Sequence, residues 1–111
     1  MDWPTSSTGY IAETGNKLIE VTSIDDFVSE NNISSVNVIK IDVEGFGANV
    51  FEGMKLSIDK FKPVIFFEIH NNEEYDTLMT IKEARNYELY NLKGTKTSNP
   101  DIGEQIIALP L

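Results

Sequence analysis

The chain has 111 residues, of which 41% are hydrophobic and 24% charged, the composition of an ordinary folded domain. Its 18 acidic and 9 basic side chains leave a formal charge of −9, which argues against nucleic acids and anionic membranes as partners. The absence of cysteine excludes disulfides and thiolate chemistry, and the lack of a long apolar run or a signal pattern makes the cytoplasm the expected location.

The N-terminal part of the chain predicts a lead-in followed by a hairpin. Residues 1–8 are polar and contain a proline, so we expect an irregular segment there and a single domain over 9–111. Gly15-Asn16 is a turn dipeptide between two short runs, Gly9–Thr14 and Lys17–Val21. This arrangement is typical of a two-stranded antiparallel hairpin.

The middle of the chain predicts a helix, a buried strand and a second helix. Thr22 or Ser23 can cap the first helix, because both side chains accept hydrogen bonds from free backbone N–H groups. Asn37–Asp42 is a compact apolar run of the kind found in buried strands. A helical pattern begins at about Ala48 and ends at Lys62-Pro63, since proline disfavours helix at the residue before it.

The C-terminal part predicts three strands and one helix. Val64–Ile69 has five apolar residues in six, which is typical of a strand covered by helices on both faces. Glu73–Asn86 has helical periodicity, Tyr87–Leu92 and Gln105–Leu109 favour strands, and Lys93–Gly103 favours a loop. The order predicts an α/β fold with a sheet of about four strands, mostly parallel with the last strand antiparallel, and flanking helices.

Four polar residues follow the two strongest strands and form the candidate site. Asp42 and Glu44 are two residues apart at the end of one strand, and Glu68 and His70 are two apart at the end of the next. Residues two apart in a strand point to the same side. If the strands are parallel neighbours, these side chains meet at the carboxyl edge of the sheet, where open α/β sheets bind ligands.

Such a cluster has two chemical uses and one purely structural one. Carboxylates with an imidazole can bind Mg²⁺, Ca²⁺ or Mn²⁺, which would make this a small metal-binding domain. Alternatively His70 or one of the acids can act as a general base near neutral pH. In the structural alternative the acids cap the following helices and His70 is a hydrogen-bonded residue without a chemical role.

Gly45-Phe46-Gly47 stands between a strand and a helix, as in dinucleotide-binding loops. Val50 occupies the position of the third glycine of that motif. The carboxylates of Asp42 and Glu44 would also repel a phosphate. We therefore interpret this segment as a turn and not as a nucleotide site.

Several motifs resemble those of the FkbM-family methyltransferases. Val38–Gly45 (VIKIDVEG) is similar to the family's signature turn, and Gly53-Met54 to the pair that ends its helix. Val21–Val28 (VTSIDDFV) and Lys62–His70 (KPVIFFEIH) are similar to the family's flanking segments, and Tyr87–Tyr90 to the strand after them. The likeness covers about residues 9–109.

The resemblance implies an S-adenosylmethionine-dependent O-methyltransferase with a class I, Rossmann-like fold. Asp42 would lie beside the methyl donor and the acceptor, and would contact the cofactor. Glu44, Glu68 and His70 would line the acceptor side, where a base takes the proton of the acceptor hydroxyl. The acceptor in such families is a sugar or another small hydroxylated molecule.

The chain departs from the family in two respects. It has no counterpart of the family's glycine-rich loop or of the acidic residue after its second strand, so we expect a C-terminal half-domain that binds S-adenosylmethionine poorly. Gly47 stands where the family usually has Glu, which suits a relic or a shortened chain and weakens the helix start by up to about 1 kcal/mol.

A half-domain would leave the strand Asn37–Asp42 at the edge of the sheet. Unpaired strand edges bind other strands. We therefore expect a homodimer or a partner chain across this strand, unless the N-terminal hairpin covers it. Such pairing gives the alternative to a methyltransferase fragment, which is a non-enzymatic oligomerisation or binding module derived from the same fold.

Overall fold

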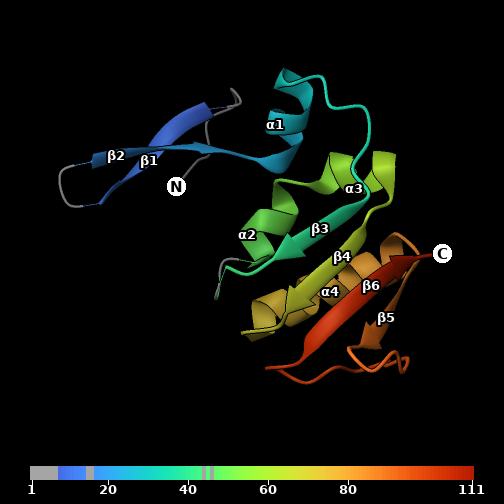
Figure 1. Cartoon of the computed structure of the whole chain (residues 1–111). Helices are drawn as coiled ribbons and strands as arrows, with labels where there is room; N and C mark the ends of the chain where they lie inside the picture. The colour runs from blue at the N-terminus through green and yellow to red at the C-terminus, as the bar shows by residue number, and fades with distance from the viewer. Residues whose placement is uncertain (1–7, 15–16, 44, 46) are drawn as a thin grey trace.

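A computed structural model describes residues 8–14, 17–43, 45 and 47–111, and its elements follow the expected order (Figure 1). The elements are β1 (Thr8–Thr14), β2 (Lys17–Thr22), α1 (Ile24–Glu30), β3 (Val38–Ile41), α2 (Gly47–Glu52), α3 (Lys55–Phe61), β4 (Val64–Glu68), α4 (Asn72–Ala84), β5 (Tyr87–Asn91) and β6 (Gln105–Pro110).

The four C-terminal strands form one mixed sheet in the order β3-β4-β6-β5. β3 and β4 are parallel, and β6 is antiparallel to both of its neighbours, β4 and β5. The expectation of an antiparallel last strand is therefore confirmed. Because β6 inserts between two strands that run the same way, three of the four strands are parallel in direction, as expected, although only β3 and β4 are directly paired in parallel.

Among the described strands, β3 is an edge strand of this sheet. β1 and β2 form a separate antiparallel hairpin, as expected, and the hairpin does not pair with β3. The turn residues Gly15 and Asn16 and the lead-in up to residue 7 lie outside the described residues. The pairing of another chain with β3 stays a prediction.

The sheet packs against helices on one face only. Burial alternates along the strands, so that Ile65 and Phe67 of β4 are buried while Phe66 between them is 37% exposed. The buried side chains of the strands form a single core with residues of α2, α3 and α4, such as Phe51, Ile58 and Leu78. The expectation that helices cover both faces of β4 is wrong for the described part of the chain, because these helices all supply this one core.

The helical stretch expected from about Ala48 to Lys62 is divided into α2 and α3, with a break at Gly53. The carboxylate of Asp25 in α1 accepts hydrogen bonds from the N–H groups of Leu56 and Ser57, at 3.0 and 2.8 Å, and so caps the start of α3. A cap from another helix cannot be read from local sequence. None of the described helices is long and apolar enough to cross a membrane.

The other helix boundaries follow local signals in the sequence. Ser23 caps α1 by accepting a hydrogen bond from the N–H of Asp26 at 3.1 Å. α3 ends at Phe61 and is followed by its C-cap Lys62, whose φ of 49° is left-handed, directly before Pro63. These capping side chains and the proline determine where each helix begins and ends.

Tyr87 is a buried polar residue that joins β5 to the start of β4. Its side chain is 1% exposed, and its hydroxyl donates a hydrogen bond to the carbonyl of Pro63 at 2.7 Å. Burial, and secondly the nearby Asp59 carboxylate, raises the pKa of Tyr87 from 10.0 to about 12. The native state therefore retains the phenol proton over a range of pH in which the unfolded chain loses it.

We predict that Tyr87→Phe lowers the free energy of unfolding by about 1–2 kcal/mol at neutral pH, because the Pro63 carbonyl loses its donor. The stabilising contribution of the raised pKa is fully present below pH 10.0 and is lost as the pH rises to about 12. Urea unfolding at several pH values should show the difference between the two proteins shrinking over this interval. Equal stabilities at neutral pH, or a difference independent of alkaline pH, would contradict the prediction.

Candidate functional site

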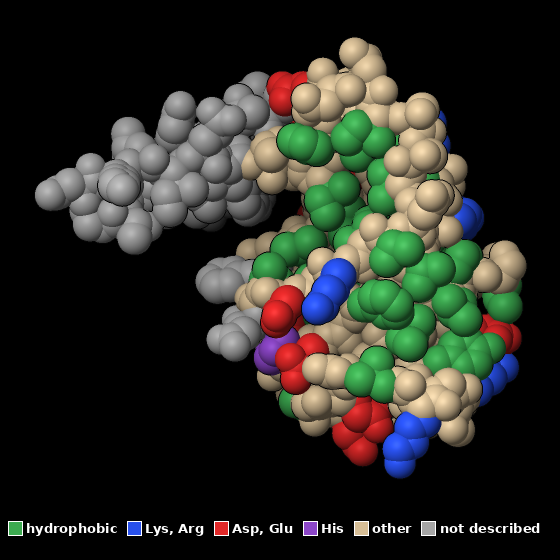
Figure 2. Space-filling model, viewed as in Figure 1, with side chains coloured by type: hydrophobic (Ala, Val, Ile, Leu, Met, Phe, Trp, Pro, Cys, Tyr) green, Lys and Arg blue, Asp and Glu red, His purple; other side chains and the backbone are tan. Residues whose placement is uncertain are grey.

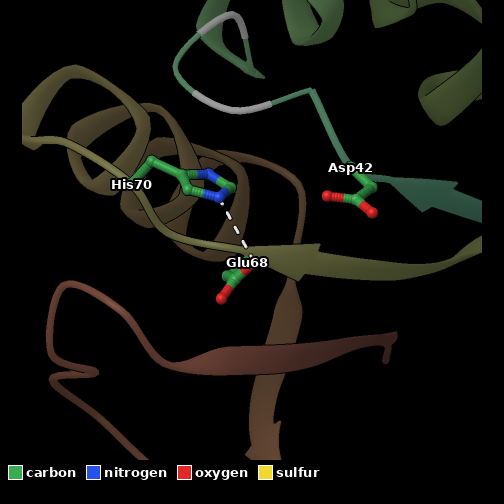
Figure 3. A group of neighbouring side chains, drawn as sticks. All are labelled: Asp42, Glu68 and His70. Carbon is green, nitrogen blue, oxygen red and sulfur yellow. Dashed lines mark ion pairs between the residues drawn. The ribbon is translucent and has the colours of Figure 1, made fainter.

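The structure brings together three of the four candidate site residues (Figure 3). Asp42 follows β3, Glu68 ends β4, and His70 lies two residues further on. The parallel register pairs Ile41 with Phe67, so the ends of the two strands are side by side. One ligand atom from each of the three residues lies within 4.8 Å of the others. The fourth candidate, Glu44, lies outside the described residues.

The cluster is open to solvent on one side. Asp42 is exposed, and the side chains of Glu68 and His70 are 36% and 24% exposed. Nε2 of His70 lies 3.2 Å from Oε2 of Glu68, as the dashed line in Figure 3 shows. Each of the three side chains is therefore at least partly accessible to solvent.

A fourth acidic residue, Glu74, lies beneath the cluster and was not among the candidates. It is completely buried, yet it belongs to the first turn of α4. Its Oε1 accepts a hydrogen bond from the backbone N–H of His70 at 2.7 Å, and its Oε2 accepts one from the N–H of Gly47 at 2.6 Å. Nδ1 of His70, itself buried, is 3.3 Å from Oε1 but lacks the alignment of a full hydrogen bond.

Two sequence signals point to Glu74 in retrospect. It follows the capping residue Asn71 by three positions, and Asn71 accepts a hydrogen bond from the N–H of Glu74 at 2.8 Å. An Asn followed three residues later by Glu resembles a capping box. Glu74 also precedes Leu78 and Ile81 by four and seven residues, the spacing of the inner face of α4, where all three are buried.

Glu74 also restricts which residue can occupy position 47. A Cβ at Gly47 would lie 2.5 Å from Cζ of Phe67 and 2.6 Å from Oε2 of Glu74, so only glycine fits there. The N–H at the start of α2 is already bonded to the Glu74 carboxylate. The missing side chain at this position is thus compensated by a carboxylate from α4. The N–H of Gly47 is therefore not free to bind a phosphate or a cofactor.

The cluster of Asp42, Glu68 and His70 does not lie in the hollow found among the helices. A hollow of about 180 Å³ separates α2 and α3 from α4, with Phe51, Lys55 and Thr77 among the residues that line it. None of the three clustered residues lines this hollow.

Comparison with known proteins identifies the family of the chain. The family model of the methyltransferase FkbM domain matches residues 2–92, which is most of the 111 residues. The chain belongs to the FkbM methyltransferase family. The match includes most of the expected lead-in and ends before β6, so it differs at both ends from the expected range of 9–109. No curated protein and no solved structure matches the chain.

We predict that Glu74→Gln destabilises this FkbM domain far more than Glu73→Gln. In the variant, the amide NH₂ that replaces one carboxylate oxygen would face one of the two buried N–H donors, at a cost of about 1–3 kcal/mol. Glu73, exposed in the same turn of α4, is a matched control, because both changes remove one negative charge near the helix start. Thermal and urea unfolding measure both effects, and equal losses of stability would contradict the bridging role of Glu74.

Proposed function

We propose that this FkbM domain supplies the acceptor side of a methyl transfer from S-adenosylmethionine to a hydroxyl group of a sugar or another small molecule. Family membership supports methyl transfer as the reaction class, and the family generally uses S-adenosylmethionine. The observation that carries the proposal is the position of His70. Its imidazole lies between Glu68 on the open side and the buried carboxylate of Glu74 on the other.

His70 is proposed as the base that takes the proton of the acceptor hydroxyl. We place the ring proton on Nδ1, the buried nitrogen that faces the Glu74 carboxylate at 3.3 Å. Nε2, which lies 3.2 Å from Oε2 of Glu68, is then the nitrogen that can accept a proton. Nε2 would take the proton of the acceptor hydroxyl as that oxygen gains the methyl group, whose bond to the sulfonium sulfur of S-adenosylmethionine would break to leave S-adenosylhomocysteine. Glu68, 3.2 Å from Nε2, would stabilise the resulting imidazolium ion.

Asp42 is proposed to orient the acceptor. Its carboxylate is exposed beside Nε2 and Glu68, and it can accept a hydrogen bond from a second hydroxyl of the acceptor. Sugars and related molecules offer such neighbouring hydroxyls. Two carboxylates and one imidazole, all within 4.8 Å, therefore favour a polyhydroxylated acceptor.

The described residues fit the acceptor side of the reaction and not the cofactor side. Gly47 is crowded by Glu74 and Phe67, and in the described part of the chain we find no other glycine-rich loop between a strand and a helix. We therefore propose that the four-stranded sheet corresponds to the second half of a methyltransferase fold. The first half would have to provide the site for S-adenosylmethionine.

We predict that His70→Gln lowers kcat for methyl transfer by about 10²–10⁴-fold and changes the KM for the acceptor little, because glutamine cannot take up a proton. Transfer of a labelled methyl group to a panel of sugars and phenols measures this effect. The chain is tested by itself and joined to the cofactor-binding half of a complete family member. Glu83→Gln, an exposed change on α4, is the control.

Two results would contradict the proposal. One is full activity of the His70→Gln variant in the joined protein. The other is micromolar binding of S-adenosylmethionine to the isolated chain in calorimetry, which would show a cofactor site within these residues.

A second candidate function is the binding of a divalent cation, favoured by the ligand atoms of Asp42, Glu68 and His70 that lie within 4.8 Å of one another. The carboxylate of Glu74 behind the imidazole is also the kind of partner that metal-binding histidines have. Two carboxylates and one nitrogen suit Mg²⁺ or Mn²⁺.

If this second function is correct, we predict that millimolar Mn²⁺ raises the melting temperature and broadens the NMR signals of the single imidazole, and that Asp42→Asn removes both effects. Mn²⁺ is paramagnetic, so the broadening places the ion beside His70. Glu83→Gln again serves as the control. Unchanged melting temperature and signals at millimolar Mn²⁺ would exclude the cation site.

A further inference from the structure

The sheet face that the described helices leave open carries an aromatic side chain beside the candidate site. Phe66 and Glu68 are two residues apart on β4, so their side chains point to the same face and their Cα atoms are about 7 Å apart. Phe66 is 37% exposed. Figure 2 shows hydrophobic side chains gathered over the strands on this side, next to acidic residues and the histidine. The exposed ring therefore borders the cluster of Asp42, Glu68 and His70.

The charges on this face are separated along the strands. Lys40 of β3 is the register neighbour of Phe66, and it forms no ion pair with any described residue. Asp42 and Glu68 lie two residues further along the two strands, at the cluster. Among the residues that the structure describes, Asp42 has no cationic partner and Glu68 has only the imidazole of His70. The face is therefore positive at Lys40 and negative at the cluster.

We propose that the methyl acceptor of this site is an amino sugar, whose ring stacks on Phe66 and whose ammonium group binds the carboxylates of Asp42 and Glu68. This inference rests on the proposed function, because it names the molecule whose hydroxyl proton passes to His70. The hydroxyl next to the ammonium group on the sugar ring is the one that meets Nε2 of His70, which lies 3.2 Å from Oε2 of Glu68. Phe66 and Asp42 then determine the specificity of the site.

The exposed aromatic ring favours a cyclic acceptor over a linear one. One face of a sugar ring carries mainly C–H groups, and such a face packs against an aromatic side chain and removes apolar surface from water. A nearby ammonium group adds attraction to the negative face of the aromatic ring. A linear polyol offers no comparable flat face. Phe66 therefore selects the shape of the acceptor.

The two carboxylates favour a positively charged group on that ring. An ammonium group has three hydrogen-bond donors, and its charge-assisted bonds to carboxylates are stronger than those of a neutral hydroxyl. The formal charge of −9 adds a general attraction for cations. An anionic sugar would instead place its charge beside Asp42 and Glu68, with Lys40 alone to balance it. Lys40 also repels the ammonium group, which directs it and its neighbouring hydroxyl toward the cluster.

Titration of the chain with glucosamine in the absence of a methyl donor, followed through the amide NMR signals, tests the proposal. We expect the largest shifts in residues 40–42 and 66–70. Glucosamine should bind at least about fivefold more tightly than N-acetylglucosamine, which has a neutral amide in place of the ammonium group. Ethanolamine has the ammonium and hydroxyl groups without the ring, and it should bind at least about fivefold more weakly than glucosamine.

Two variants with matched controls identify the contacts. Asp42→Asn should largely remove the preference for glucosamine over N-acetylglucosamine, whereas Asp76→Asn, the same change at an exposed position on α4, should retain it. Phe66→Leu should weaken the binding of both sugars about fivefold, because it removes the aromatic ring and keeps an apolar side chain. Val38→Ala is its control, since Val38 is 56% exposed on β3 and lies further from the cluster. Far-UV circular dichroism verifies that the variants fold.

Several results would overturn the proposal. These are no binding of glucosamine at high millimolar concentration, equal binding of N-acetylglucosamine or ethanolamine, and a preference for glucosamine that survives Asp42→Asn. The titration also separates this inference from the proposed base. If glucosamine binds as expected but His70→Gln retains full methyl transfer, the base assignment is wrong and the acceptor site stands. If His70→Gln abolishes transfer but the chain shows no preference for glucosamine, the acceptor class is wrong and the base assignment stands.

Discussion

The rest of this structure depends on one buried carboxylate. Glu74 lies without exposure beneath the ends of β3 and β4, and its two oxygens accept hydrogen bonds from the N–H groups of Gly47 and His70. A buried charge is costly unless such bonds compensate it, so these partners must stay in place for the domain to fold. The same bonds hold the start of α2, the end of β4 and α4 together. They also determine the position of the only imidazole.

The hydrogen bonds of Glu74 both stabilise the domain and orient His70 in the candidate site. Because Glu74 holds the His70 backbone and faces Nδ1, the opposite nitrogen points toward Glu68 and the open side. The described helices cover only one face of the sheet, and the other face carries exposed apolar side chains such as Phe66. The chain belongs to the FkbM methyltransferase family, and its Gly47 has no room for a side chain beside Glu74 and Phe67.

Much of the fold could be predicted because its signals are local. Ser23 and Asn71 cap α1 and α4, proline ends α3, and the apolar runs become strands. Three features could not be predicted in this way. Asp25 caps a helix other than its own, β6 inserts between β4 and β5, and Phe66 is exposed within an apolar run. Each of these depends on which segments become neighbours in space.

The sequence by itself determined the elements, their order, the family and the two pairs of polar residues at the strand ends, because periodicity, caps and motifs act within a few residues of each other. Only the tertiary structure decided that Asp42, Glu68 and His70 share one site, since that requires β3 and β4 to be parallel neighbours. Only the tertiary structure shows that Glu74, one of many acidic residues in the sequence, is buried and bridges two backbone N–H groups. Burial and long-range hydrogen bonds are properties of packed segments, and no stretch of sequence contains them.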